Sequence, residues 1–302
     1  MTENIICFGE MLWDMLPSGK QPGGAPMNVA VHLKNLGLQV SIISRVGDDE
    51  LGKELLDFLS EKNIDTSLIQ QGQTHLTGVV KANVDNKNEV TYKIVHPVAW
   101  DYIQLDETSE RAVEDAAVFI FGSLAARSES SQNTLHHLLK KANLKVFDVN
   151  LRPPYYNQET VEYLLKQADF VKMNHNELAE ISSWYEEYAD ENQAMANLIQ
   201  QYDLKALCVT KGENGAKLWQ NGKFYDCKGF KVEVKDTIGS GDSFLAALLK
   251  GYLNKTEPSE NLLFACATGS LVATYLGATP AISESQIQSF ILQSAPNHEF
   301  QV

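Results

Sequence analysis

Short apolar runs recur along the chain as far as residue 209, and polar or glycine residues follow them. The runs are Ile5–Phe8, Val40–Val46, Val118–Phe121, Val146–Val149, Phe170–Met173 and Leu207–Val209. Between them, Asn28–Leu36 and Glu50–Leu59 carry apolar residues at helical spacing. Apolar strands that alternate with helices are typical of a mostly parallel sheet with helices on both faces. We therefore expect one α/β domain over residues 1–302, because no repeat or linker interrupts the alternation.

Two segments, about 10–25 and 74–101, contain strand-like runs without helices to cover them. In the second segment, the turn-forming residues Asp85–Asn88 join the runs His75–Asn83 and Glu89–Val95. The simplest assembly of these segments is a small β-sheet lid over the ends of the main strands. A lid of this kind can exclude water from a site beneath it.

The formal net charge of −14 argues against nucleic acid or an anionic membrane as the main partner. The four cysteines have no metal-ligand spacing: Cys7, Cys208, Cys227 and Cys266. The sequence begins without a positively charged segment followed by a long apolar stretch. We therefore expect no signal peptide, no membrane span and a cytoplasmic protein.

The turn Asp236–Asp242, which leads into the apolar helical pattern after Phe244, has the composition of an anion site. Gly239 and Gly241 let the backbone approach a ligand closely, and a helix that begins there directs free N–H groups at it. Asp242 adds a carboxylate that serves either as a general base or as a cap of the helix. An anion site with a base is what phosphoryl transfer to a hydroxyl group needs.

Two familiar nucleotide-binding motifs do not fit this turn. A dinucleotide-binding fingerprint needs a third glycine where this chain has Phe244. The phosphate-binding loop of nucleotide hydrolases needs Gly-Lys-Ser/Thr, which occurs nowhere in the chain. A nucleotide-dependent oxidoreductase is disfavoured on this ground, and lack of NAD binding would exclude it.

Polar residues follow four of the predicted strands. They are Gly122-Ser123, the group Asp148, Asn150 and Arg152, then Asn174, and finally Thr210-Lys211-Gly212. In open α/β sheets, ligands bind outside the carboxyl ends of the strands. We therefore expect these side chains to converge on one site.

Two motifs together give the chain a family resemblance. Gly23–Ala30, ending at Leu36-Gly37, resembles the N-terminal signature of the ribokinase-like (PfkB) carbohydrate kinases. Asp236–Asp242 resembles the C-terminal signature of the same family. The segment Asp148–Pro153 is similar to fructokinases and to 2-keto-3-deoxygluconate kinases, and the family resemblance covers essentially the whole chain.

The resemblance implies a three-layer α/β/α domain with a β-sheet lid and an ATP-dependent transfer of phosphate to a primary hydroxyl of a small sugar. Fructose is the first expectation, because Gly9-Glu10 with Asp14 and the segment Ala99–Asp101 also look fructokinase-like. A 2-keto-3-deoxygluconate kinase and another sugar or nucleoside kinase of the family stay open. A catalytically silent sugar sensor on the same fold is the alternative from outside the enzymes.

The resemblance also implies roles for the matching residues. Asp242 becomes the base that takes the proton of the sugar hydroxyl, and the N–H groups of Gly239, Ser240 and Gly241 stabilise the moving phosphoryl group. The sugar is bound by Asp14, Gly23, Gly24 and Asn28, together with Asp242 itself. A carboxylate such as that of Asp14 accepts hydrogen bonds from two neighbouring hydroxyl groups.

The nucleotide and magnesium side of the site is also assigned by resemblance. Asn174 and Glu177 match a family element that organises magnesium and phosphate through water, although Asn and Glu three residues apart also form a capping box. The nucleotide-binding residues are Thr210, Lys211, Gly212 and Gly215, with Asn174 and Gly241. Cys266 departs from the family, which often has an asparagine near the adenine, so the nucleotide preference stays open.

Three further expectations complete the prediction. Arg152 reaches either a phosphate or substrate oxygen, or a partner in a surface ion pair. A monovalent cation such as potassium binds near Asp236, Ile238 and residues 277–281. An uncovered lid face with Leu12, Leu76 and Val80 favours a homodimer through the lids.

Overall fold

The computed structural model describes residues 4–16, 19–84, 90–185 and 187–294. The main sheet contains β1 (Asn4–Phe8), β4 (Gln39–Gly47), β5 (Ile69–Gly72), β8 (Val118–Gly122), β9 (Leu144–Asp148), β10 (Phe170–Asn174), β11 (Ala206–Thr210), β12 (Ala216–Gln220) and β13 (Lys223–Cys227). Their order is β13-β12-β11-β10-β9-β8-β1-β4-β5, and the pairs from β11 to β5 are parallel. The six predicted strands are all present in this sheet.

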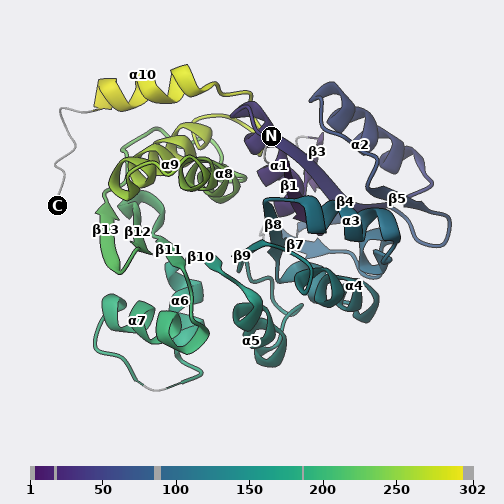
Figure 1. The fold of residues 1–302 in the computed structure, drawn as a ribbon. Coiled ribbons are helices and arrows are strands. Elements are labelled where there is room, and N and C mark those ends of the chain that lie inside the picture. The colour runs from purple at the N-terminus through teal and green to yellow at the C-terminus, as the bar shows by residue number, and fades with distance from the viewer. Residues whose placement is uncertain (1–3, 17–18, 85–89, 186, 295–302) are drawn as a thin grey trace.

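Helices cover both faces of this sheet (Figure 1). One layer contains α1 (Ala25–Asn35), α2 (Glu50–Glu61), α8 (Ser240–Leu253), α9 (Pro258–Val272) and α10 (Glu284–Ser294). The other contains α3 (Glu107–Asp115), α4 (Glu129–Leu139), α5 (Gln158–Gln167), α6 (His175–Ser182) and α7 (Glu191–Tyr202). In β1, Ile5 and Cys7 face the first layer while Ile6 and Phe8 face the second, which explains the continuous apolar run.

The two elements at the β13 edge were not predicted. Strands β12 and β13 pair antiparallel with β11 and with each other. Both are short, β12 alternates the buried Ala216 and Leu218 with half-buried residues, and β13 has no buried residue, so neither has the apolar run that marks a central strand. Strand β5 at the opposite edge was missed for the same reason, because only two of its four residues are buried.

A second sheet of four strands contains β2 (Leu12–Leu16), β3 (Gly19–Gly23), β6 (Gly78–Val84) and β7 (Val90–Ile94), in the order β3-β2-β6-β7. We call it the small sheet. Its strands come from the two segments predicted to lie outside the helical alternation, although the predicted turn Asp85–Asn88 lies outside the described residues. Within the described ranges, no helix has the length and apolar character needed to cross a bilayer.

One detail of the small sheet differs from the prediction. Leu12 is only 4% exposed, so the chain itself covers this side chain and it does not belong to an open apolar face. Leu76, in contrast, is 73% exposed, and Val80 is half-buried.

Candidate active site

Asp242 lies in the first turn of α8, and its carboxylate does not cap that helix. The N-cap is Gly239, with φ at 77°, and no side chain accepts a hydrogen bond at this helix start. Instead, Oδ2 of Asp242 accepts a hydrogen bond of 2.8 Å from Nδ2 of Asn28 in α1. The capping alternative is therefore wrong, and residues from both sequence motifs meet across a separation of 214 positions.

Free backbone donors lie next to this carboxylate. Within the described residues, the N–H groups of Gly241 and Asp242 have no hydrogen-bond partner. The N–H group of Ser240 donates to the carbonyl oxygen of Thr237 at 3.3 Å, and its hydroxyl donates to that of Gly269. The start of α8 thus offers unpaired N–H groups to an anion, with Ser240 fixing the turn.

Lys172 was missed by the sequence analysis, yet it lies at the centre of the site. Its ammonium group donates to both carboxylate oxygens of Asp148, at 3.0 and 3.3 Å, and both side chains are buried. A Cβ atom on Gly241 would lie 3.2 Å from Nζ of Lys172, so the cation lies beside the free N–H groups. The only signal in the sequence was a lysine inside the apolar run Phe170–Met173.

The electrostatics of Asp242 suit a general base. Burial and the neighbouring Asp148 raise the pKa of Asp242 to about 6, while Lys172, Asn28 and Arg152 act in the opposite direction. A base with a pKa slightly below neutral is largely ionised at pH 7 and still accepts a proton readily. The pKa of Lys172 is raised, because the attraction of Asp148 and of Asp242 outweighs the effect of burial.

Asp14 and Gly23 are brought together by the small sheet. Strands β2 and β3 pair so that a Cβ atom on Gly23 would lie only 2.3 Å from Oδ2 of Asp14. Any larger residue at position 23 would displace this carboxylate. Burial raises the pKa of Asp14 to about 6; the charge of Arg152 lowers this pKa, and that of Asp236 raises it.

Arg152 follows β9 and makes no ion pair with any described residue. Its guanidinium group nevertheless lowers the pKa of Glu10, Asp14 and Asp242. The surface ion pair that was the alternative is therefore absent from the described part of the chain. Arg152 is instead an exposed cation that acts on the buried carboxyl of Glu10 and on the half-buried carboxyls of Asp14 and Asp242.

Asn174 and Glu177 form the capping box of α6. Asn174 accepts hydrogen bonds from the N–H groups of Asn176 and Glu177, and Oε2 of Glu177 accepts one from the N–H group of Asn174. The other oxygen, Oε1, accepts from the N–H group of Leu151 at 2.9 Å. Glu177 therefore also fixes the loop that carries Arg152, and burial raises its pKa.

The predicted nucleotide loop follows β11. The hydroxyl of Thr210 donates to the carbonyl oxygen of Met173 at 3.4 Å, and Lys211 pairs with Glu191 and Asp226. Lys211 thus has protein partners already. Cys266 in α9 is buried and in contact with Cys227 of β13. Cys227 lies at the same end of the sheet as Thr210, because Ala216 pairs with both residues.

Asp236 joins two loops beside the start of α8. Its Oδ1 accepts from the N–H group of Ile238 at 3.0 Å, and its Oδ2 accepts from that of Gly277 at 3.1 Å. The Nε2–H group of the buried His32 donates to the carbonyl oxygen of Ala278 at 2.9 Å. Burial lowers the pKa of His32 to about 4, so this ring is neutral at pH 7.

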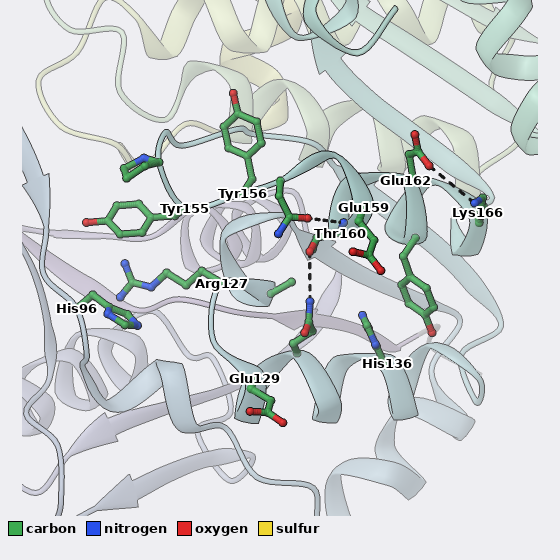
Figure 2. Close-up of a pocket in the computed structure, with 15 residues that line it drawn as sticks. His96, Arg127, Glu129, His136, Tyr155, Tyr156, Glu159, Thr160, Glu162 and Lys166 are labelled. Carbon is green, nitrogen blue, oxygen red and sulfur yellow. Dashed lines mark hydrogen bonds and ion pairs between the residues drawn. The ribbon is translucent and has the colours of Figure 1, made fainter. Parts of the chain in front are cut away.

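A cavity of about 710 Å³ lies between α4 and α5 (Figure 2), and none of the predicted site residues lines it. Figure 2 shows His96, Arg127 and Tyr155 together at one end of it. Arg127 donates to both oxygens of Asp101 and to the carbonyl oxygen of Val95, and Tyr155 donates to that of Ile94. We call Arg127, Asp101 and Tyr155 the anchor, because they tie the end of β7 to the main body.

Comparison with known proteins identifies the family to which the chain belongs. The model of the pfkB family carbohydrate kinases matches residues 15–285. The chain belongs to the pfkB family of carbohydrate kinases. This membership excludes the oxidoreductase alternative and confirms the resemblance seen in the two glycine motifs.

Relatives of this pfkB kinase include named sugar kinases. A probable fructokinase-7 of Arabidopsis thaliana is 30% identical, over 96% of this chain and 92% of its own length. A putative sugar kinase of Pyrococcus horikoshii is 32% identical, over 82% of each chain. The crystal structure of a fructokinase with bound ATP from Xylella fastidiosa has a TM-score of 0.86 at 25% identity and covers 98% of this chain and all of that one.

Proposed function

We propose that this pfkB kinase transfers the γ-phosphoryl group of ATP to a primary hydroxyl group of fructose. The observation that carries the proposal is the Asp242 carboxylate, which is held by Asn28 beside unpaired N–H groups and does not cap its helix. The named fructokinase relatives and the ATP in the Xylella fastidiosa enzyme support the choice of both substrates.

The residues divide the work as follows. Asp14 and Asn28 bind and orient the sugar, and the carboxylate of Asp242 takes the proton of the attacking hydroxyl group. The N–H groups at the start of α8 and the ammonium group of Lys172 stabilise the negative charge that moves with the phosphoryl group. The backbone at Gly212 and Gly215, with Thr210 and Asn174, lines the nucleotide.

The charges of the site favour a neutral sugar over an acidic one. The carboxylates of Asp14, Asp148 and Asp242 outnumber the two cations that act on them, Arg152 and Lys172. Lys172 is already engaged by Asp148. A 2-keto-3-deoxygluconate carboxylate would need a second free cation, so this kinase activity is the second candidate.

Magnesium fits the site only through water and phosphate. No cluster of three or more acidic, histidine or cysteine side chains in the described ranges could hold a metal ion alone. Both oxygens of Glu177 accept backbone hydrogen bonds, which suits a residue that orients water. When bound, magnesium neutralises charge on the nucleotide phosphates.

A monovalent cation such as potassium fits the junction at Asp236. This carboxylate already joins the loops at Ile238 and Gly277, and backbone oxygens such as that of Ala278 lie against the start of α8. Oxygen atoms alone form such a site, as hard cations require. The cation would order the turn that binds the phosphoryl group.

The small sheet acts in this proposal as a lid formed by residues of about 10–25 and 74–101. It carries Asp14, and the exposed Leu76 and Met15 give it apolar surface for a homodimer contact. The cytoplasmic location stays a prediction of the sequence.

The test is a coupled ADP-release assay with a panel of neutral sugars, acidic sugars and nucleosides. We expect fructose to give the highest kcat/KM, with turnover dependent on magnesium. A preference for 2-keto-3-deoxygluconate would favour the second candidate. ADP release with no substrate of the panel, while fructose still binds in calorimetry, would support the sugar sensor instead.

A further inference from the structure

Glu10 is a buried acidic residue that no part of the proposed mechanism uses. It follows β1 at the entrance to the small sheet, and only 3% of its surface is exposed. Its Oε1 accepts a hydrogen bond of 3.2 Å from the N–H group of Ala25. Its backbone also packs against the same turn, since a Cβ atom on Gly24 would lie 2.4 Å from the carbonyl oxygen of Glu10.

The second oxygen of this carboxyl is buried and has no partner. Oε2 of Glu10 and Oδ1 of Asn28 are both buried side-chain oxygens without a hydrogen bond among the described residues. They flank one turn, because Asn28 donates its N–H group to the carbonyl oxygen of Gly24. A buried polar atom without a partner is unfavourable, so two of them beside one turn indicate a ligand that completes their bonding.

We propose that Glu10 is a sugar-positioning residue: one carboxyl oxygen holds the Gly24–Ala25 turn, and the other binds a hydroxyl group of the sugar. This inference rests on the proposed function. In this arrangement Glu10 binds one hydroxyl group that does not react, while Asp242 acts on the reacting hydroxyl group.

The carboxyl of Glu10 does this work in its neutral form. Burial raises its pKa to about 7, the N–H groups of Ala25 and of Glu10 itself lower it, Arg152 lowers it, and Asp242 raises it. Asp242 must be ionised to act as the base, so a second negative charge beside it is unfavourable. A neutral carboxyl donates one hydrogen bond and accepts others, which matches a sugar hydroxyl group.

Two variants separate this role from a structural one. Glu10→Leu removes both polar oxygens at similar volume, whereas Glu10→Gln keeps an acceptor for Ala25 and a donor for the sugar. We expect Glu10→Leu to raise the KM for fructose about tenfold while the KM for ATP stays unchanged. Glu10→Gln should keep the wild-type KM, and it should not show the rise in KM above pH 7 that we expect of the wild type. Glu110→Gln, a carboxyl change on the distant helix α3, is the control for both.

Fructose analogues that each lack one hydroxyl group identify the contact. One analogue should lose about tenfold in affinity with the wild type and almost nothing with Glu10→Leu. Equal losses in both proteins, with only the melting temperature lowered by Glu10→Leu, would overturn the inference. So would a Glu10→Gln variant as impaired as Glu10→Leu. If the wild type phosphorylates no sugar, the proposed function itself fails. If the wild type is active but the two proteins lose affinity equally, only the inference about Glu10 fails.

Discussion

Two buried groups of charges in this kinase are built in opposite ways. At the anchor, Arg127 and Asp101 have side chains that are 1% and 0% exposed, and both oxygens of Asp101 have two partners each. The guanidinium group of Arg127 also lies over the rings of Trp100 and Tyr155, at 3.8 and 4.8 Å. Among the described residues, Nη1 of Arg127 and Nε1 of the adjacent Trp100 have no hydrogen-bond partner.

At the active site, in contrast, carboxyls are crowded and incompletely bonded. Asp242 has one side-chain hydrogen bond, and Glu10 has an unpaired oxygen. Burial raises the pKa of both, and that of Asp14. A buried carboxylate whose oxygens all have partners, such as that of Asp101, fixes one conformation, whereas unfilled bonding capacity and shifted pKa values are typical of groups that bind a substrate.

Asp242→Asn should give the largest effect, and it falls on turnover. The amide cannot take a proton, so we expect kcat to fall by about 10² to 10⁴ while fructose binding and the melting temperature stay close to wild type. Steady-state kinetics, calorimetry and thermal unfolding measure the three quantities. A folded variant with near-normal kcat would remove Asp242 from the role of base.

Arg127→Met should give the next largest effect, and it falls on stability. The change leaves the carboxylate of Asp101 buried without its cation, which costs about 3–5 kcal/mol of the free energy of unfolding. Urea denaturation measures the loss. The double variant with Asp101→Leu should recover most of it, because no unpaired charge remains. If turnover of the folded single variant fell as far as that of Asp242→Asn, the contrast between the two groups would be wrong.

Lys172→Met tests the boundary between the two kinds of group, because it removes a paired cation inside the active site. In the wild type, kcat/KM should fall as the pH drops through about 6, since Asp242 must be ionised. Lys172 lowers the pKa of Asp242, so its loss should raise that pKa and move the fall in rate to higher pH. The pH–rate profile measures the shift. Lys172→Arg keeps the charge and should move the profile less; an unmoved profile in Lys172→Met would contradict the electrostatic role.

Asp49→Asn should give the smallest effect. Asp49 is the N-cap of α2, and it also accepts hydrogen bonds from the N–H and hydroxyl groups of Thr77 beside the small sheet. The amide keeps one acceptor oxygen, so we expect a loss of about 1 kcal/mol in the free energy of unfolding. Thr77→Val is the matched variant, since it removes only the hydroxyl contact. A loss above that of Arg127→Met would show that this junction, and not the anchor, holds the small sheet.

The apolar pattern and the glycine motifs were enough to predict the architecture and both halves of the candidate site. Apolar runs buried on both faces predicted six parallel strands, because only a doubly covered sheet accepts them. The glycine turns predicted Asp242, Asn28 and Gly23, because a tight turn before a helix has few chemical uses. The antiparallel strands β12 and β13 at one end of the sheet were not predicted, since neither contains a continuous apolar run.

The surroundings of the charged residues depend on contacts that form only in the folded chain. Whether Asp242 caps its helix or faces Asn28 depends on a contact between residues 214 positions apart, which no local pattern contains. In the sequence, Lys172 is a single charged residue in an apolar strand. The folded chain places its ammonium group between Asp148 and the start of α8. The role proposed for Glu10 rests on its Oε2 atom, which has no hydrogen-bond partner among the described residues. Residue types and spacing limit the chemistry, but burial and partners, which set pKa values and bonding capacity, exist only in the folded chain.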